Sequence, residues 1–176
     1  MNTGLKLALL TTCGTLLTLC ACKREFGHRV SPVPQVAAKL ELTGGGLARP
    51  TTFTFEQLAN LPMTRLDHVL FQKTHKEDEV TSWQGPALET LLAAAQLQPG
   101  AMTVTLEATD GYAIETTLES LKDAIVALKD DQGRWLAEIN NNCPLRLVPP
   151  HKPGNFWIMN LCRIKVEPAG SSATSP

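Results

Sequence analysis

Two histidines in this sequence stand beside groups with which they could do chemistry. His75 precedes the acidic run of residues 77–79, and imidazole with carboxylates could hold a metal ion weakly. The more usual explanation of such a charge run is a solvated hairpin tip. His151 lies in the proline-rich segment 149–154, where it could meet an anion or simply be a surface histidine. With neither a phosphate-binding glycine loop nor a serine nucleophile elbow in the sequence, we assign no catalytic residue and no metal ligand.

The cysteines suggest covalent chemistry of two kinds. Three of the five lie in the first 22 residues, which leaves Cys143 and Cys162 in the remainder of the chain. In an oxidising compartment we expect these two to form a disulfide that closes a loop of about 20 residues, contributing roughly 3 kcal/mol on the chain-entropy view. The alternative is two buried free thiols that pack as small hydrophobic side chains.

The N-terminus has the features of an export signal. Lys6 precedes an apolar stretch over residues 7–19, which is shorter than the roughly 20 residues that a membrane-spanning helix needs. The following Leu19-Cys20-Ala21-Cys22 resembles a bacterial lipobox. Cys22 follows the small Ala21 and is the expected lipidation site, because Cys20 follows the bulky Leu19. An uncleaved anchor or an ordinary secretory signal is the alternative.

A lipid at Cys22 would make this a periplasmic protein anchored to the outer or inner membrane by its acyl chains. Lys23, directly after that cysteine, favours the outer membrane. We expect a signal peptide over residues 1–22, a tether over 23–35, one domain over 36–167 and a loose tail over 168–176.

The composition is that of a folded protein without an affinity for nucleic acid. Hydrophobic residues make up 43% and charged residues 19% of the sequence, which is typical of a globular domain. The formal net charge is -1 and there is no long basic run, so nothing would neutralise the phosphates of a nucleic acid.

Short strands and helices must position these residues. Apolar and polar residues alternate over residues 38–42, and Thr54 with Gln57 has the spacing of a capping box for a brief helix. Residues 69–71 and 80–83 predict the two arms of a hairpin. Pro86 fits the first turn of a helix whose inward stripe comprises Leu88, Leu91, Leu92 and Ala95.

The second half of the domain is richer in strands. Residues 102–108 and 112–116 predict a strand pair around an Asp-Gly turn. Residues 118–128 suit either a helix or a hairpin in which 124–128 pairs with 135–139. Two strands, 145–148 and 158–166, complete the domain. Since strand pairs with tight turns dominate, the fold class is α+β.

Four segments in this order resemble the oxidoreductase molybdopterin-binding domain of sulfite-oxidase-type enzymes. They are Trp83-Gln84-Gly85-Pro86-Ala87-Leu88, Asp110-Gly111-Tyr112, the run Asn141-Asn142-Cys143-Pro144-Leu145-Arg146-Leu147-Val148-Pro149, and the closing strand 158–166. The resemblance covers essentially the whole domain. It implies a mixed β-sheet with short flanking helices and a pterin pocket built from loops.

The resemblance also implies which residues would bind a cofactor. Asn141 and Arg146 match positions that contact the pterin phosphate or ring, Gly154 matches a glycine that lets the backbone approach the cofactor, and His151 lies beside them. Arginine suits this role because its planar charged fork pairs bidentately with phosphate. In the competing interpretation Arg146 pairs with a local carboxylate, Asn141 is a turn residue and Pro153-Gly154 is a plain turn.

Two departures from the family concern the metal. Catalytic members carry a molybdenum-ligating cysteine before the Trp-x-Gly motif, at about residues 72–74, but this chain has no cysteine between Cys22 and Cys143. Histidine or lysine does not replace a soft thiolate. The family's lysine in the last loop, near Met159, is also missing.

We therefore expect a cell-envelope lipoprotein whose domain is a non-catalytic binding or accessory module for a small anionic ligand or a protein partner. Molybdopterin is a possible cofactor only through the family resemblance. The alternative is a molybdopterin-dependent oxidoreductase in envelope electron transfer, and a third interpretation is a structural lipoprotein without a ligand.

Overall fold

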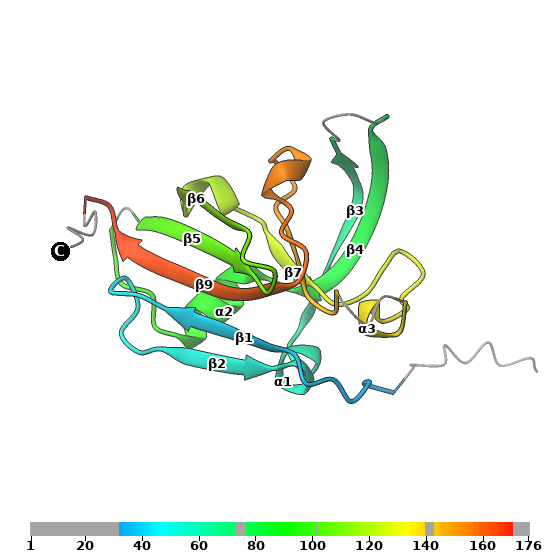
Figure 1. Cartoon of the computed structure of the whole chain (residues 1–176), viewed down its shortest axis with the longest axis horizontal. Coiled ribbons are helices and arrows are strands. Elements are labelled where there is room, and N and C mark those ends of the chain that lie inside the picture. Colours follow the sequence, from blue (N-terminus) through cyan, green and yellow to red (C-terminus); the bar gives the residue numbers. More distant parts are fainter. Residues whose placement is uncertain (1–31, 73–76, 101, 140–142, 171–176) are drawn as a thin grey trace, which may run out of the picture. The chain divides into compact units, whose positions relative to one another are not determined.

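The largest element of the domain is a five-stranded mixed sheet, seen in a computed structural model that describes residues 32–72, 77–100, 102–139 and 143–170 (Figure 1). Its strand order is β2-β1-β9-β5-β6, and β1 pairs with β9 in parallel while the other pairs are antiparallel. The strands are β1 (Lys39–Thr43), β2 (Thr51–Thr54), β5 (Met102–Ala108), β6 (Ala113–Thr117) and β9 (Leu161–Pro168). The expected α+β class and mixed sheet are confirmed.

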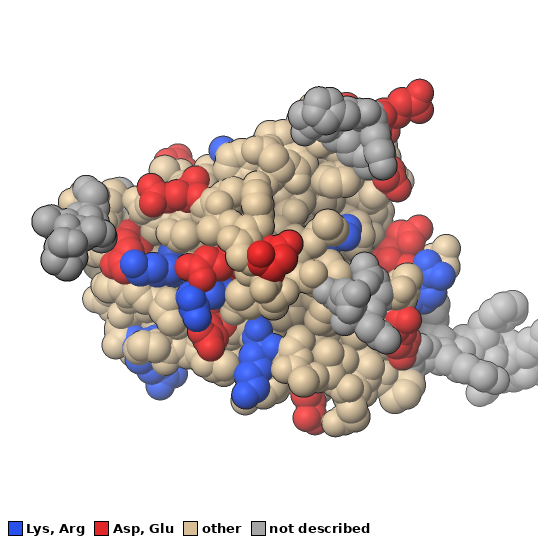
Figure 2. All heavy atoms as spheres, viewed as in Figure 1, with Lys and Arg blue, Asp and Glu red and all other residues tan. Residues whose placement is uncertain are grey.

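Alternating burial explains why these segments are strands. In β5 every second residue is buried, from Met102 through Val104 and Leu106 to Ala108, as the alternation in the sequence predicts. The opposite face carries charge: Arg163 of β9 is 3.0 Å from Glu41 of β1 and 2.8 Å from Glu107 of β5. In the view of Figure 2 basic and acidic side chains are intermingled over this sheet.

A two-stranded ribbon extends beyond the sheet (Figure 1). It consists of β3 (Met63–Phe71) and β4 (Glu79–Pro86), paired antiparallel, so the predicted hairpin is confirmed. The register shifts between Leu66 and Val69, where His68 has a positive φ of 55°. This bulge bends the ribbon and increases its twist.

The helices are short. Helix α1 (Phe55–Ala59) begins at the predicted capping box, in which Thr54 Oγ1 accepts from the Gln57 N–H at 3.2 Å and Gln57 Oε1 accepts from the Thr54 N–H at 2.8 Å. Helix α2 (Leu88–Ala94) buries Leu88, Leu91 and Leu92 as expected. It begins later than predicted, because Pro86 ends β4 and Ala87 is the N-cap. None of the helices in the described ranges is both long and apolar enough to cross a membrane.

The ambiguous region resolves into a 3-10 turn and a strand. Residues Glu119–Leu121 form the 3-10 helix η1, and β7 (Ile125–Ala127) pairs with β8 (Arg146–Val148). The alternative hairpin is wrong in its second arm: the chain turns tightly, with the Leu136 N–H bonded to the Leu128 carbonyl, but then forms helix α3 (Leu136–Ile139).

Strand β7 separates two apolar clusters. Val126 belongs to the main core between the sheet and α1 and α2, whereas Ile125 and Ala127 belong to a smaller cluster with Val69, Leu136, Val148 and Trp157. Half-buried Leu66, Phe71 and Trp83 of the ribbon pack on the smaller cluster. This smaller cluster is the floor on which the candidate site is built.

Candidate functional site

Arg146 is the central residue of the candidate site. It begins β8 and forms an isolated bridge with Met159, and its guanidinium lies over Trp83 of β4. Its guanidinium carbon is 4.6 Å from the centre of the Trp83 ring, and Nη2 lies 3.1 Å from Met159 Sδ. Its Nε is buried without a hydrogen-bond partner, and no carboxylate among the described residues pairs with it. The interpretation in which Arg146 pairs with a local carboxylate is therefore wrong for the described residues.

An aromatic wall supports the guanidinium. The Trp83 and Trp157 rings meet edge to face with centroids 6.4 Å apart, and Phe71 lies 4.7 Å from Trp157. Both indoles are fixed by hydrogen bonds, since Trp83 Nε1 donates to Thr81 Oγ1 at 2.9 Å and Trp157 Nε1 donates to the Lys152 carbonyl at 3.2 Å. The Arg146 guanidinium thus packs on an indole ring whose orientation is fixed, and cation–π attraction stabilises this position.

Gly154 joins the last loop to the end of the ribbon. It begins the 3-10 helix η2 (Gly154–Phe156), and its N–H donates to the Gln72 carbonyl at 3.1 Å. A Cβ at this position would lie 2.2 Å from that carbonyl oxygen and 2.6 Å from Phe71 Cε2. The backbone at Gly154 thus closely approaches the chain's own backbone at Gln72, while its approach to a cofactor stays a prediction.

Of the other two predicted ligand residues, only His151 lies in the described part of the chain, and its observed polar partner is not a residue of this wall. His151 is 65% exposed at its side chain, and its Nε2 lies 3.3 Å from Asp123 Oδ2. Asn141 lies outside the described residues. The structure therefore joins Arg146 and Gly154 through the aromatic wall and gives His151 a different neighbour.

The predicted disulfide is wrong in this structure, because both cysteines are free. Cys143 is buried and its Sγ accepts from the Asn160 N–H at 3.4 Å, whereas Cys162 Sγ donates to the Glu107 carbonyl at 3.4 Å. Where β9 pairs with β5, Cys162 is the unpaired extra residue of a β-bulge in β9. This bulge directs the Cys162 thiol to the Glu107 carbonyl. Burial raises the pKa of the Cys162 thiol, although the Arg163 charge acts in the opposite direction.

The donor set at the wall fits an anion better than a metal. The family's cysteine position falls at about residues 72–74, and of these Gln72 uses its carbonyl to accept from the Gly154 N–H. Cys143, the cysteine closest to Arg146 in sequence, is only 4% exposed. The described residues hold no group of three or more potential metal-ligating side chains, and His75 lies outside them. The arrangement therefore fits the anionic part of a pterin cofactor but not a thiolate-ligated molybdenum.

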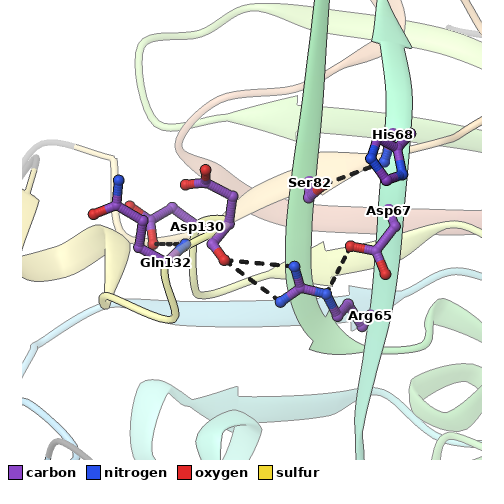
Figure 3. A network of polar contacts seen from close by, with 7 residues as sticks. Arg65, Asp67, His68, Ser82, Asp130 and Gln132 are labelled. Atoms are coloured by element: carbon purple, nitrogen blue, oxygen red, sulfur yellow. Dashed lines mark hydrogen bonds and ion pairs between the residues drawn. The ribbon is translucent and has the colours of Figure 1, made fainter.

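A polar network at the base of the ribbon was not foreseen from the sequence. Arg65 donates to Asp67 at 2.7 Å and to the Asp131 carbonyl at 3.5 Å, and the His68 N–H donates to Ser82 Oγ (Figure 3). Asp130 is 8% exposed, but its carboxylate accepts from the backbone N–H groups of Gln132 and Arg134 and from the Arg134 side chain. Because these hydrogen bonds all come from its own turn, Asp130 stabilises the conformation of that loop.

Family comparison agrees with this fold. Residues 30–174 match the oxidoreductase molybdopterin binding domain, and the chain belongs to this family. Among solved structures it is similar to the sulfane dehydrogenase SoxCD from Paracoccus pantotrophus, with a TM-score of 0.65 and 21% identity. The similarity covers 78% of this chain but only 40% of the SoxCD chain, and at this identity it establishes the fold alone. A comparison with curated protein sequences gave no significant match.

Proposed function

We propose that this domain binds a small anionic ligand through Arg146 and serves as a non-catalytic binding or accessory module of the bacterial envelope. The supporting observation is the guanidinium of Arg146, which rests on Trp83 with a buried, unbonded Nε and no carboxylate partner among the described residues. A partly buried charge without a counter-charge is costly, and an anion would compensate it with charge-assisted hydrogen bonds.

The non-catalytic role rests on the missing thiolate. At about residues 72–74, directly after β3, catalytic relatives carry their molybdenum-ligating cysteine, but this chain has no cysteine between Cys22 and Cys143. Pterin phosphate remains one ligand that Arg146 suits chemically. A molybdopterin cofactor, if bound, would supply redox chemistry at its metal, while Arg146 would hold only its anionic group.

The alternative function is a molybdopterin-dependent oxidoreductase that takes part in envelope electron transfer. It is supported by membership of the family and by the likeness of the fold to a sulfane dehydrogenase. The envelope location in both proposals rests on the lipobox-like sequence ending at Cys22, which would hold the domain to the periplasmic side of the outer or inner membrane.

Calorimetric titration with inorganic pyrophosphate tests the role of Arg146. Arg146→Ala should weaken binding by about 1.5–3 kcal/mol, the usual loss for a hydrogen bond to a charged group. Arg146→Lys should give an intermediate loss, because the charge remains but the planar fork does not. Arg163→Ala is the matched control, since Arg163 is already paired with Glu41 and Glu107.

Two results would count against the proposal. Unchanged binding by Arg146→Ala would remove the assigned role, and an equal loss in Arg163→Ala would reduce the effect to general surface charge.

A further inference from the structure

A groove on a different part of the domain has the size of a small-molecule site. It lies between helix α2 and the segment around η1, with the start of β3 at one side, and its volume is about 810 Å³. Typical ligand pockets measure about 300–1,000 Å³. None of the residues that line it belongs to the aromatic wall or to Arg146.

The floor and walls of this groove are apolar. Leu88 and Leu92 of α2 and Leu121 of η1 are buried at its base. Leu66, Leu97 and Leu118 line it as half-buried side chains that keep part of their surface open to solvent. An alkyl or aryl group laid on these leucines would remove apolar surface from water, which is the main favourable term in binding such a group.

The rim of the groove carries more carboxylates than cations. Glu89 of α2 and Glu119 of η1 both line the groove and are exposed, and neither has an ion-pair partner in the part of the chain that the structure describes. Asp123 also lines the groove but is engaged by His151 at 3.3 Å. Lys122 supplies one positive charge among the described lining residues, so the acidic groups outnumber it by three to one.

We propose that this groove binds a cationic amphiphile, whose apolar body lies on the leucines and whose amine or ammonium group lies by Glu89 and Glu119. The charge of the rim selects this class over fatty acids, because a carboxylate head group would meet like charges. The site is separate from the one proposed at Arg146 and does not depend on it.

Titration calorimetry with two probes of equal chain length and opposite charge tests this proposal. Decyltrimethylammonium and decanoate, each kept below its micelle concentration, should both reach the groove, with the cation bound about three- to tenfold more tightly at low ionic strength. The preference should shrink as salt is added, because exposed charges are screened. Equal binding, tighter binding of decanoate or no binding of the cation would each overturn the proposal.

Two neighbouring alanines of α2 provide a matched pair of variants. Ala93 lines the groove and Ala94 does not, and both are exposed, so phenylalanine should be tolerated in the fold at either position. Ala93→Phe should fill the groove and lower affinity for decyltrimethylammonium at least about tenfold, whereas Ala94→Phe should bind as the unmodified protein does. Equal losses in the two variants would show adsorption at another surface and overturn the proposal.

The charge preference has its own variants. A double variant with Glu89→Gln and Glu119→Gln should bind decyltrimethylammonium and decanoate with affinities within about twofold of each other. Arg146→Ala should leave the binding of the cation unchanged, which separates this site from the anion site. If the double variant kept the full preference for the cation, the proposed role of Glu89 and Glu119 in selecting a cationic ligand would be overturned.

Discussion

Replacing Gly85 of β4 with alanine should destabilise the domain more than the same change at a glycine in an open turn, such as Gly111. Gly85 lies in the Trp-x-Gly motif on β4, where an added Cβ would be 1.9 Å from the Val126 carbonyl oxygen and 2.8 Å from Ala127 Cα. Ordinary carbon–oxygen contacts are about 3.3 Å or longer, so β4 and β7 would have to separate by more than about 1 Å. The motif glycine is therefore a consequence of close strand packing.

The cost follows from how firmly β7 is held. It is buried on both faces, pairs with β8 on one side, and is bridged to Ala87 beside β4 on the other. Overpacking of a firmly held core costs about 1–3 kcal/mol, and here backbone atoms must move, so we expect at least about 3 kcal/mol. That is a large share of the about 5–15 kcal/mol that stabilises an ordinary domain.

Urea unfolding followed by tryptophan fluorescence measures this loss as a shift in the transition midpoint. Gly111→Ala is the control, because Gly111 has a positive φ of 88° but no atom within 4 Å of an added Cβ. Its cost should be the backbone strain alone, about 1–2 kcal/mol. If Gly85→Ala cost no more than Gly111→Ala, the close contact between β4 and β7 would be refuted.

Two further predictions concern the cysteines. Peptide mapping after iodoacetamide treatment should find Cys162 unlinked to Cys143, and its alkylation in the folded protein should rise at higher pH than in urea, because burial raises the pKa of its thiol and keeps it protonated. A Cys143–Cys162 cross-link, or a pH midpoint at or below that in urea, would contradict this. Cys22→Ser should release soluble protein or leave an unprocessed precursor in membrane fractionation, and a wild-type distribution would contradict the lipidation proposal.

Local signals in the sequence predict local structure well. The Thr54–Gln57 spacing predicts a capping box that forms with both hydrogen bonds, and alternation over residues 102–108 predicts the burial pattern of β5. These signals work because one face of each element is buried and the other is open, so the period of the apolar residues reports the backbone conformation.

Elsewhere the decisive contacts join residues far apart in the chain. Strand β7 is buried on both faces, so it shows no alternation and the sequence leaves helix and strand open. The stacking of Arg146 on Trp83 depends on how strands distant in sequence are arranged. The β-bulge that turns Cys162 toward Glu107 likewise depends on the register between β5 and β9. A resemblance of motifs could indicate that Arg146 matters, but only the fold could show what surrounds it.

The molybdenum content of the purified protein tests the central claim most directly. Protein isolated from a molybdenum-replete host that makes the pterin cofactor should contain far less than one molybdenum per chain by elemental analysis, because this chain has no thiolate at the end of β3 to ligate the metal. One molybdenum per chain, retained through purification, would contradict the account.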